Sequence, residues 1–182
     1  MARQGMANHY VCPQLPPSPA AAIALAESII VGSKLPVTLI GSSLGGYYAT
    51  YLAEKYALKA VLVNPAVPAV PAHLDAEKFL GPQVNLYTGE PFEFIAAYVD
   101  ELRAIEIPHL NDPARYWLLA ETGDEVLDYR HAVEKYRGAK QTVLPGGDHS
   151  FMRWEDYLDA IIAFAGLTPN NAGRVCAPPH RA

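Results

Sequence analysis

The sequence predicts an α/β fold with a mostly parallel sheet flanked by helices, and three observations support this prediction. Short apolar runs alternate with longer amphipathic stretches along most of the 182 residues, a pattern typical of strands connected through helices. Hydrophobic residues make up 51% of the chain, which is enough to form a buried core. The length suits one domain rather than two.

The first half of the chain contains five predicted elements. Residues 9–13 predict a short strand, which ends at a proline-rich loop, and residues 20–31 predict an amphipathic helix. The three elements that follow are a buried strand over residues 36–40, a helix over residues 44–57 and a strand over residues 59–65.

Residues 66–113 interrupt this alternation. They contain several prolines, a turn-like segment and one helix predicted over residues 92–105. A long excursion between two strands is often a lid or a binding loop, although a helical crossover with irregular ends would give the same pattern. We therefore expect a lid-like insertion, a partial lid, within a single domain over residues 1–166.

The regular alternation returns near residue 115. The predicted elements are a strand over residues 115–124, a helix over residues 126–138, a strand and turn over residues 140–149 and a helix over residues 150–166. The last of these carries an apolar stripe that predicts core packing: Phe151, Trp154, Leu158, Ile161 and Ala165. Residues 167–182 offer little to bury and predict a flexible C-terminal tail.

Charge and composition narrow the class of partner. The formal net charge is −5 at pH 7 and no long basic run occurs, which argues against nucleic acid or an anionic membrane as the main partner. The first ten residues lack the apolar segment of a secretory signal. Cys12 and Cys176 predict two free thiols rather than a disulfide. We therefore expect a cytoplasmic protein.

The segment Gly-Ser-Ser-Leu-Gly-Gly joins a predicted strand to a predicted helix. Ser43 has Gly41 and Gly45 two positions to either side, which is the G-x-S-x-G pattern of a nucleophile elbow. Such a sharp turn lifts one serine above the sheet, and the two glycines are expected to avoid steric collision. Ser43 is therefore the candidate nucleophile.

Other interpretations of this corner are less consistent with its residues. Ser42 does not fit the pattern, because Ile40 and Leu44 flank it at the same distance. A helix N-terminus attracts anions, but the segment matches neither G-x-G-x-x-G nor the P-loop; tight packing alone is the structural alternative. The N–H group of Leu44, at the start of the helix, is a candidate oxyanion donor.

A serine nucleophile needs a base within hydrogen-bond reach and an acid that orients the base. In the α/β-hydrolase arrangement the acid and then the histidine follow the serine along the chain. His149 follows a strand and a flexible Gly-Gly-Asp segment, and Asp124 directly follows the preceding strand. The alternative for His149 is a histidine on the surface without a catalytic role. The alternative for Asp124 is the N-cap of the next helix. No cluster has the spacing of metal ligands, and no cofactor is expected.

Six segments together resemble the small bacterial YqiA-type esterases, a branch of the α/β-hydrolase superfamily. They are PQLPPSP, IGSSLGGYYAT, VNPAV, YTGE, TGDEVLDYR and GGDHSF, and the likeness runs from about Tyr10 to about Gly166. The resemblance implies the α/β-hydrolase fold and a serine hydrolase of short acyl esters, with thioesters such as acyl-CoA as further substrates. The family's serine, aspartate and histidine fall on Ser43, Asp124 and His149.

One feature of the resembling family is missing from this sequence. Family members carry a further strand and a His-Gly-Phe turn ahead of the strand that leads into PQLPP. That turn usually supplies the second oxyanion amide, the first being the N–H group of Leu44. We therefore expect either that the neighbouring strands close the gap or that the nucleophile strand has an unpaired edge.

These observations predict a carboxylic-ester hydrolase that acts on a small-molecule acyl ester or thioester. Ser43 would attack the acyl group, His149 would transfer the proton and Asp124 would orient the imidazole. The alternatives are an acyl-CoA thioesterase and a truncated, weakly active or inactive hydrolase-fold protein that acts as a binding module. An exposed strand edge would favour a homodimer.

Overall fold

The computed structural model describes residues 9–68, 76–85 and 88–167. The chain divides into two compact units. The larger unit is Gln14–Met152, and the smaller one combines Met1–Pro13 with Arg153–Ala182. Each is described by itself.

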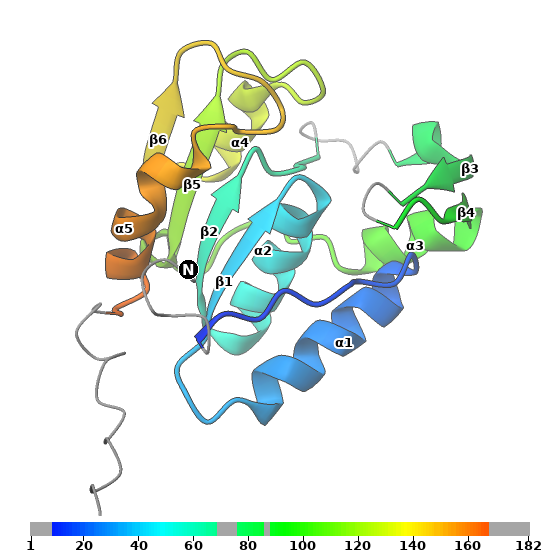
Figure 1. Cartoon of the computed structure of the whole chain (residues 1–182), viewed down its shortest axis with the longest axis horizontal. Coiled ribbons are helices and arrows are strands. Elements are labelled where there is room, and N and C mark those ends of the chain that lie inside the picture. Colours follow the sequence, from blue (N-terminus) through cyan, green and yellow to red (C-terminus); the bar gives the residue numbers. More distant parts are fainter. Residues whose placement is uncertain (1–8, 69–75, 86–87, 168–182) are drawn as a thin grey trace, which may run out of the picture. The chain divides into compact units, whose positions relative to one another are not determined.

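A four-stranded parallel sheet forms the centre of the larger unit (Figure 1). In the order of the sheet, its strands are β1 (Thr38–Ser42), β2 (Lys59–Val63), β5 (Tyr116–Glu121) and β6 (Lys140–Leu144). Because the strands are parallel, all four carboxyl ends lie at the same edge of the sheet. The prediction of a mostly parallel sheet is confirmed.

Within its described residues the larger unit has four α-helices: α1 (Pro19–Gly32), α2 (Leu44–Tyr56), α3 (Ala96–Ala104) and α4 (Tyr129–Lys135). Helix α2 packs on β1 and β2, and α4 packs on β5. The core between these helices and the sheet includes Ala53 of α2, Leu62 of β2 and Leu118 of β5, all fully buried. Apart from the exposed Lys59, the residues that alternate with these in β2 and β5 are buried as well, as expected for a parallel sheet.

The predicted helix over residues 92–105 is wrong in its first part. A two-stranded antiparallel sheet of β3 (Gly81–Val84) and β4 (Pro91–Phe94) precedes α3, which begins at Ala96. Phe92 and Phe94 recur at a period of two, and both pack into the core. That spacing places both rings on one side of a strand, whereas a helix would point them about 200° apart on the basis of its 3.6-residue turn.

The predicted strand over residues 9–13 is also wrong. These residues form no strand, and among the described residues β1 pairs with β2 alone. Of the two expected outcomes, the described part of the chain therefore shows the strand before Ser43 at the edge of the sheet. A strand acquires its identity from cross-strand hydrogen bonds, which a short apolar run cannot provide by itself.

The described part of the smaller unit contains helix α5 (Trp154–Phe164). Ile161 and Ile162 of this helix are buried. The helix begins later than the predicted residue 150, because Phe151 has a φ angle of 50°, which a right-handed helix does not allow. Of the predicted tail, only Leu167 lies within the described residues.

None of the helices in the described ranges is both long enough and apolar enough to cross a membrane. Cys12 is exposed, whereas Cys176 lies outside the described residues.

Candidate active site

Ser43 occupies a strained turn between β1 and α2. Its φ and ψ angles are 51° and −122°, a conformation that side-chain-bearing residues rarely adopt. Hydrogen bonds fix it from the neighbouring strand: the N–H group of Ser43 donates to the carbonyl of Val63 at 3.0 Å, and its carbonyl accepts from Ala66 N at 2.9 Å. Strained residues of this kind are found where the surrounding structure determines the conformation, and they cluster at functional sites.

The glycines around Ser43 have different roles from those that the pattern predicts. A Cβ atom on Gly41 would overlap with the backbone of Gly45, so Gly41 is required for space. A Cβ atom on Gly45 would meet no neighbouring atom within 4 Å, so the predicted steric reason for Gly45 is wrong. The second glycine that space requires is Gly46, where a Cβ atom would lie 2.6 Å from Cβ of Pro65.

Three of the predicted site residues form a continuous chain of hydrogen bonds. Nε2 of His149 lies 3.0 Å from Oγ of Ser43, and Nδ1 of His149 lies 2.9 Å from each carboxylate oxygen of Asp124. The side chain of Asp124 is 1% exposed, whereas that of His149 is 21% exposed. The serine follows β1, the aspartate follows β5 and the histidine follows β6, so one edge of the sheet brings them together.

Asp124 also holds its own loop. Its Oδ1 accepts from the N–H groups of Val126 and Leu127, each at 2.9 Å. The predicted alternative, in which Asp124 caps the next helix, is wrong because the N-cap of α4 is Asp128. Asp128 forms hydrogen bonds with the side chain and the N–H group of Arg130, which lower the pKa of its carboxyl group to about 2.

The start of α2 faces the same corner. The N–H groups of Gly46 and Tyr47 donate to the carbonyl of Ser43 at 2.9 Å and 3.3 Å. The N–H group of Leu44 belongs to the first residue of the helix, where N–H groups have no partner inside the helix and the helix dipole is positive. Such groups can stabilise negative charge that develops beside Ser43.

Asp124 borders a hollow of about 330 Å³. The hollow is formed by the loop after β5 and the start of α4, and its lining residues are Thr122, Asp124, Glu125, Val126, Leu127, Asp128, Tyr129 and Arg130. Among the described residues, no group of three His, Cys, Asp or Glu side chains is arranged to hold a metal ion.

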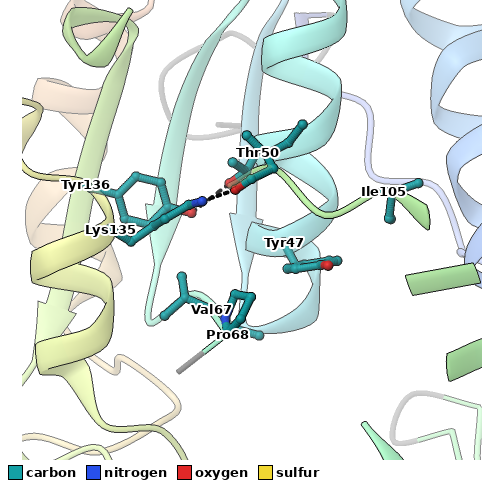
Figure 2. A pocket seen from close by; sticks show the side chains of 9 residues that line it. Tyr47, Thr50, Val67, Pro68, Ile105, Lys135 and Tyr136 are labelled. Carbon is teal, nitrogen blue, oxygen red and sulfur yellow. Dashed lines mark hydrogen bonds between the residues drawn. The ribbon is translucent and has the colours of Figure 1, made fainter. Parts of the chain in front are cut away.

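A separate cavity of about 10 Å³ lies between α2 and the end of α4 (Figure 2). It has room for about one water molecule, and it is lined in part by Tyr47, Thr50 and Lys135. The Lys135 ammonium group donates to the carbonyl of Ile107, and burial lowers the pKa of this group. Because none of the three hydrogen-bonded site residues lines this cavity, it is distinct from the site at the sheet edge.

Three further polar side chains form hydrogen bonds with the backbone at Asp148 and His149. None of them has a role predicted from the sequence. Asn64 and Glu121 are 3% and 1% exposed, and both contact the backbone beside His149. Glu125 accepts from the His149 N–H group at 3.0 Å. The signal for Asn64 is present in the sequence, since a polar amide directly follows the apolar run Ala-Val-Leu-Val.

Solved structures share this fold at low sequence identity. A protein of Agrobacterium vitis S4, named provisionally as a hydrolase, is 24% identical over 81% of this chain and 69% of its own, with a TM-score of 0.60. The α/β hydrolase domain-containing protein 10 from mouse is 16% identical over 82% and 67%, with a TM-score of 0.54. A monoacylglycerol lipase of Paleococcus ferrophilus is 15% identical over 81% and 75%, with a TM-score of 0.57.

The chain therefore has the α/β-hydrolase fold, as the sequence predicted. The model of one protein family matches residues 1–166, which include the strained corner and all the residues of the hydrogen-bonded chain. The resemblance to the YqiA-type proteins is thereby confirmed, and the chain belongs to the uncharacterised protein family UPF0227.

Proposed function

We propose that this protein is a serine hydrolase that cleaves small carboxylic esters through an acyl-enzyme. The observation that carries the proposal is the hydrogen-bonded chain from Ser43 through His149 to Asp124, with donor–acceptor distances of 3.0 Å and 2.9 Å. A serine becomes nucleophilic when a base can accept its proton and an acid orients that base. The positions of His149 beside Ser43 and of Asp124 beside His149 support these roles.

In the proposed acylation step, Oγ of Ser43 attacks the ester carbonyl carbon while Nε2 of His149 accepts the hydroxyl proton. The tetrahedral intermediate collapses as the C–O bond to the alcohol breaks, and His149 returns the proton to the departing alkoxide. Asp124 keeps Nδ1 protonated and stabilises the imidazolium that forms. Its side-chain exposure of 1% supports this role, since a fixed carboxylate away from water interacts more strongly with the cation.

In the proposed deacylation step, His149 takes a proton from a water molecule, and the hydroxide oxygen that forms attacks the carbonyl carbon of the acyl-enzyme. The bond between the acyl carbon and Oγ of Ser43 then breaks, the carboxylic acid leaves and the proton returns to Ser43. The N–H group of Leu44, at the positive end of α2, stabilises the oxyanion in both steps.

The proposed substrate class rests on the same groups. Neither step requires a cofactor, and a small-molecule acyl ester or thioester supplies the electrophilic carbonyl. One structural neighbour is named as a monoacylglycerol lipase, which adds support for ester chemistry. We propose that residues 66–113 form a lid-like insertion, and that this insertion limits the length of the acyl chain.

The proposal is tested by labelling the purified chain with a fluorophosphonate probe and locating the label by peptide mass spectrometry. We expect the label on Ser43, with loss of fluoride from the probe, and no label in Ser43→Ala or His149→Ala. Turnover of p-nitrophenyl esters with acyl chains of increasing length then measures the preference for short chains, and matched acyl-CoA thioesters measure the preference for esters.

Folded protein is required for a valid result, so circular dichroism accompanies each sample. If the folded wild-type chain takes no label and hydrolyses none of the esters, the proposed function is wrong. If the thioesters are hydrolysed faster than the esters, the mechanism stands but the substrate class changes to thioesters.

A further inference from the structure

The loop that carries His149 needs more than its own sequence to hold a defined position. It leaves β6 at Leu144 and passes through Gly146 and Gly147, whose φ angles are 69° and 75°. Glycines give such a segment wide conformational freedom. The distances around the His149 ring therefore require that other parts of the fold fix the backbone at Asp148 and His149.

Asn64 makes three side-chain hydrogen bonds that perform this task. It directly follows β2, and its Nδ2 donates to the carbonyl of Asp148 at 3.0 Å and to the carbonyl of His149 at 3.2 Å. On its other side, Oδ1 accepts from the N–H group of Glu121 at 2.9 Å. One buried amide thus joins the histidine loop to the end of β5.

Two carboxylates hold the N–H groups of the same two residues. Glu121 accepts from Asp148 N at 3.0 Å, and Glu125 accepts from His149 N at 3.0 Å. Glu125 is exposed and Glu121 lies on β5 beneath the loop. Asn64 differs from both, because its side chain bonds to the carbonyl groups of the two loop residues and to the N–H group of Glu121 at once.

The chemistry of this position requires an amide. Two carbonyl oxygens face one end of the Asn64 side chain, and an N–H donor faces the other. Only a group with donors and an acceptor satisfies both. A carboxylate of the same shape would keep the bond to Glu121 N but would place an oxygen against two carbonyl oxygens. The backbone at Asn64 has a φ angle of 38°, a region that asparagine and glycine tolerate better than other residues.

We infer that Asn64 is a positioning residue for the proposed reaction: it holds the backbone of His149 so that the imidazole spans the distance between Ser43 and Asp124. This inference rests on the proposed function. A displacement of about 1 Å in a catalytic group can reduce the rate on the order of 10²-fold. Asn64 itself touches none of the reacting atoms and acts through the loop.

Gln141 provides a matched control in the same fold. Its Nε2 also donates to two main-chain carbonyls, those of Val133 and Tyr136, at 3.0 Å and 2.8 Å. It lies near the beginning of β6, whereas His149 follows the other end of that strand. Gln141→Glu therefore removes the same kind of double hydrogen bond, at a place where it supports only the connection between α4 and β6.

The test compares Asn64→Asp, Asn64→Gly and Gln141→Glu in the full chain. The first readout is the rate of fluorophosphonate labelling at Ser43, corrected for the folded fraction measured by urea unfolding. We expect this rate to fall on the order of 10²-fold in both Asn64 variants and to stay at the wild-type value in Gln141→Glu. The glycine variant keeps the backbone conformation, so it remains informative if the aspartate variant does not fold.

A second readout follows the proton between His149 Nδ1 and Asp124 by its far-downfield NMR resonance. The resonance is assigned by its loss in Asp124→Ala. We expect it to shift or broaden in the Asn64 variants and to remain in Gln141→Glu. A folded Asn64 variant that keeps both the labelling rate and this resonance would show that Asn64 has a structural role only and would overturn the inference.

The two proposals fail in different ways. If wild-type protein is not labelled at Ser43, the proposed function fails, but the NMR comparison still measures whether Asn64 positions the imidazole. A shifted resonance then supports the positioning role, and an unchanged resonance overturns it. If wild-type protein is labelled and the Asn64 variants are labelled equally fast, only the positioning role fails.

Discussion

Gly41 lies directly against the backbone of Gly45, at the point where β1 turns into α2. A Cβ atom on Gly41 would overlap with the carbonyl group of Gly45 and would lie 2.7 Å from the nitrogen of Gly46. Backbone atoms at this corner cannot move independently, because the main chain of Ser43 also forms hydrogen bonds with the main chain of Val63 and Ala66. The close approach of two main-chain segments therefore determines which glycine the corner requires.

The two glycines of the G-x-S-x-G pattern should respond differently to the same substitution. Gly41→Ala should lower the free energy of unfolding by at least about 1–3 kcal/mol, the usual cost of overpacking. Gly45→Ala should raise it by up to about 1 kcal/mol, since Gly45 is helical, has open space around it and alanine is the better helix former. Urea unfolding of both variants measures the difference. Equal destabilisation by the two alanines would contradict the steric assignment.

The strain at Ser43 predicts that a glycine at this position stabilises the protein relative to an alanine. Ser43→Gly relieves the positive φ angle of 51°, whereas Ser43→Ala keeps the strain and removes only the hydroxyl group. Both variants should lose ester hydrolysis. The free energy of unfolding should be higher for Ser43→Gly than for Ser43→Ala by about 1–3 kcal/mol, the cost of such backbone strain. Thermal unfolding and initial-rate assays on the same samples test both parts. A glycine variant less stable than the alanine variant would show that the turn carries no strain.

Asp124→Asn should separate the two roles of this side chain. An asparagine can still accept from the N–H groups of Val126 and Leu127 through Oδ1, so the loop should remain intact. Its amide can donate to Nδ1 of His149 and so favours the wrong imidazole tautomer, which costs on the order of 10⁴-fold in kcat in serine proteases. We expect a loss of this size with little change in Tm.

The control for this substitution is Asp128→Asn, in the same loop. Asp128 contacts Arg130 and makes no hydrogen bond with His149. Its variant should keep the wild-type kcat. A comparable loss of kcat in both variants would indicate that the loop as a whole, rather than the Asp124 carboxylate, sustains the reaction.

Asp128 should also contribute to the dependence of stability on pH. The pKa of its carboxyl group falls to about 2 in the folded state because of Arg130, whereas an unfolded aspartate has a pKa of about 3.9. A lowered folded pKa means that the stabilisation is present above about pH 4 and is lost as the pH falls toward about 2. The difference in free energy of unfolding between wild type and Asp128→Asn should therefore shrink over that interval. A constant difference from about pH 5 to about pH 2 would contradict the assigned cause.

The sequence predicted most of the larger unit because buried elements leave recognisable apolar patterns in the sequence. The apolar runs of β2 and β5 are continuous and their residues are buried, as parallel strands require. The sequence did not separate the two elements within residues 92–105. Phe92 and Phe94 belong to a strand, and the helix begins only at Ala96. A short strand depends on a partner from another part of the chain, and local periodicity over four residues is too brief to separate the two periods.

The candidate site shows the same division. Residue type and chain order were sufficient to single out Ser43, Asp124 and His149, because an elbow, a strand end and a flexible loop each have a local pattern. The tertiary structure alone decided that β1 lies at the edge of the described sheet, that Gly46 rather than Gly45 needs its small size, and that Asn64 holds the loop of His149. Each of these depends on contacts between segments far apart in the chain, and the distance between two such segments is set by packing rather than by the residues of either one.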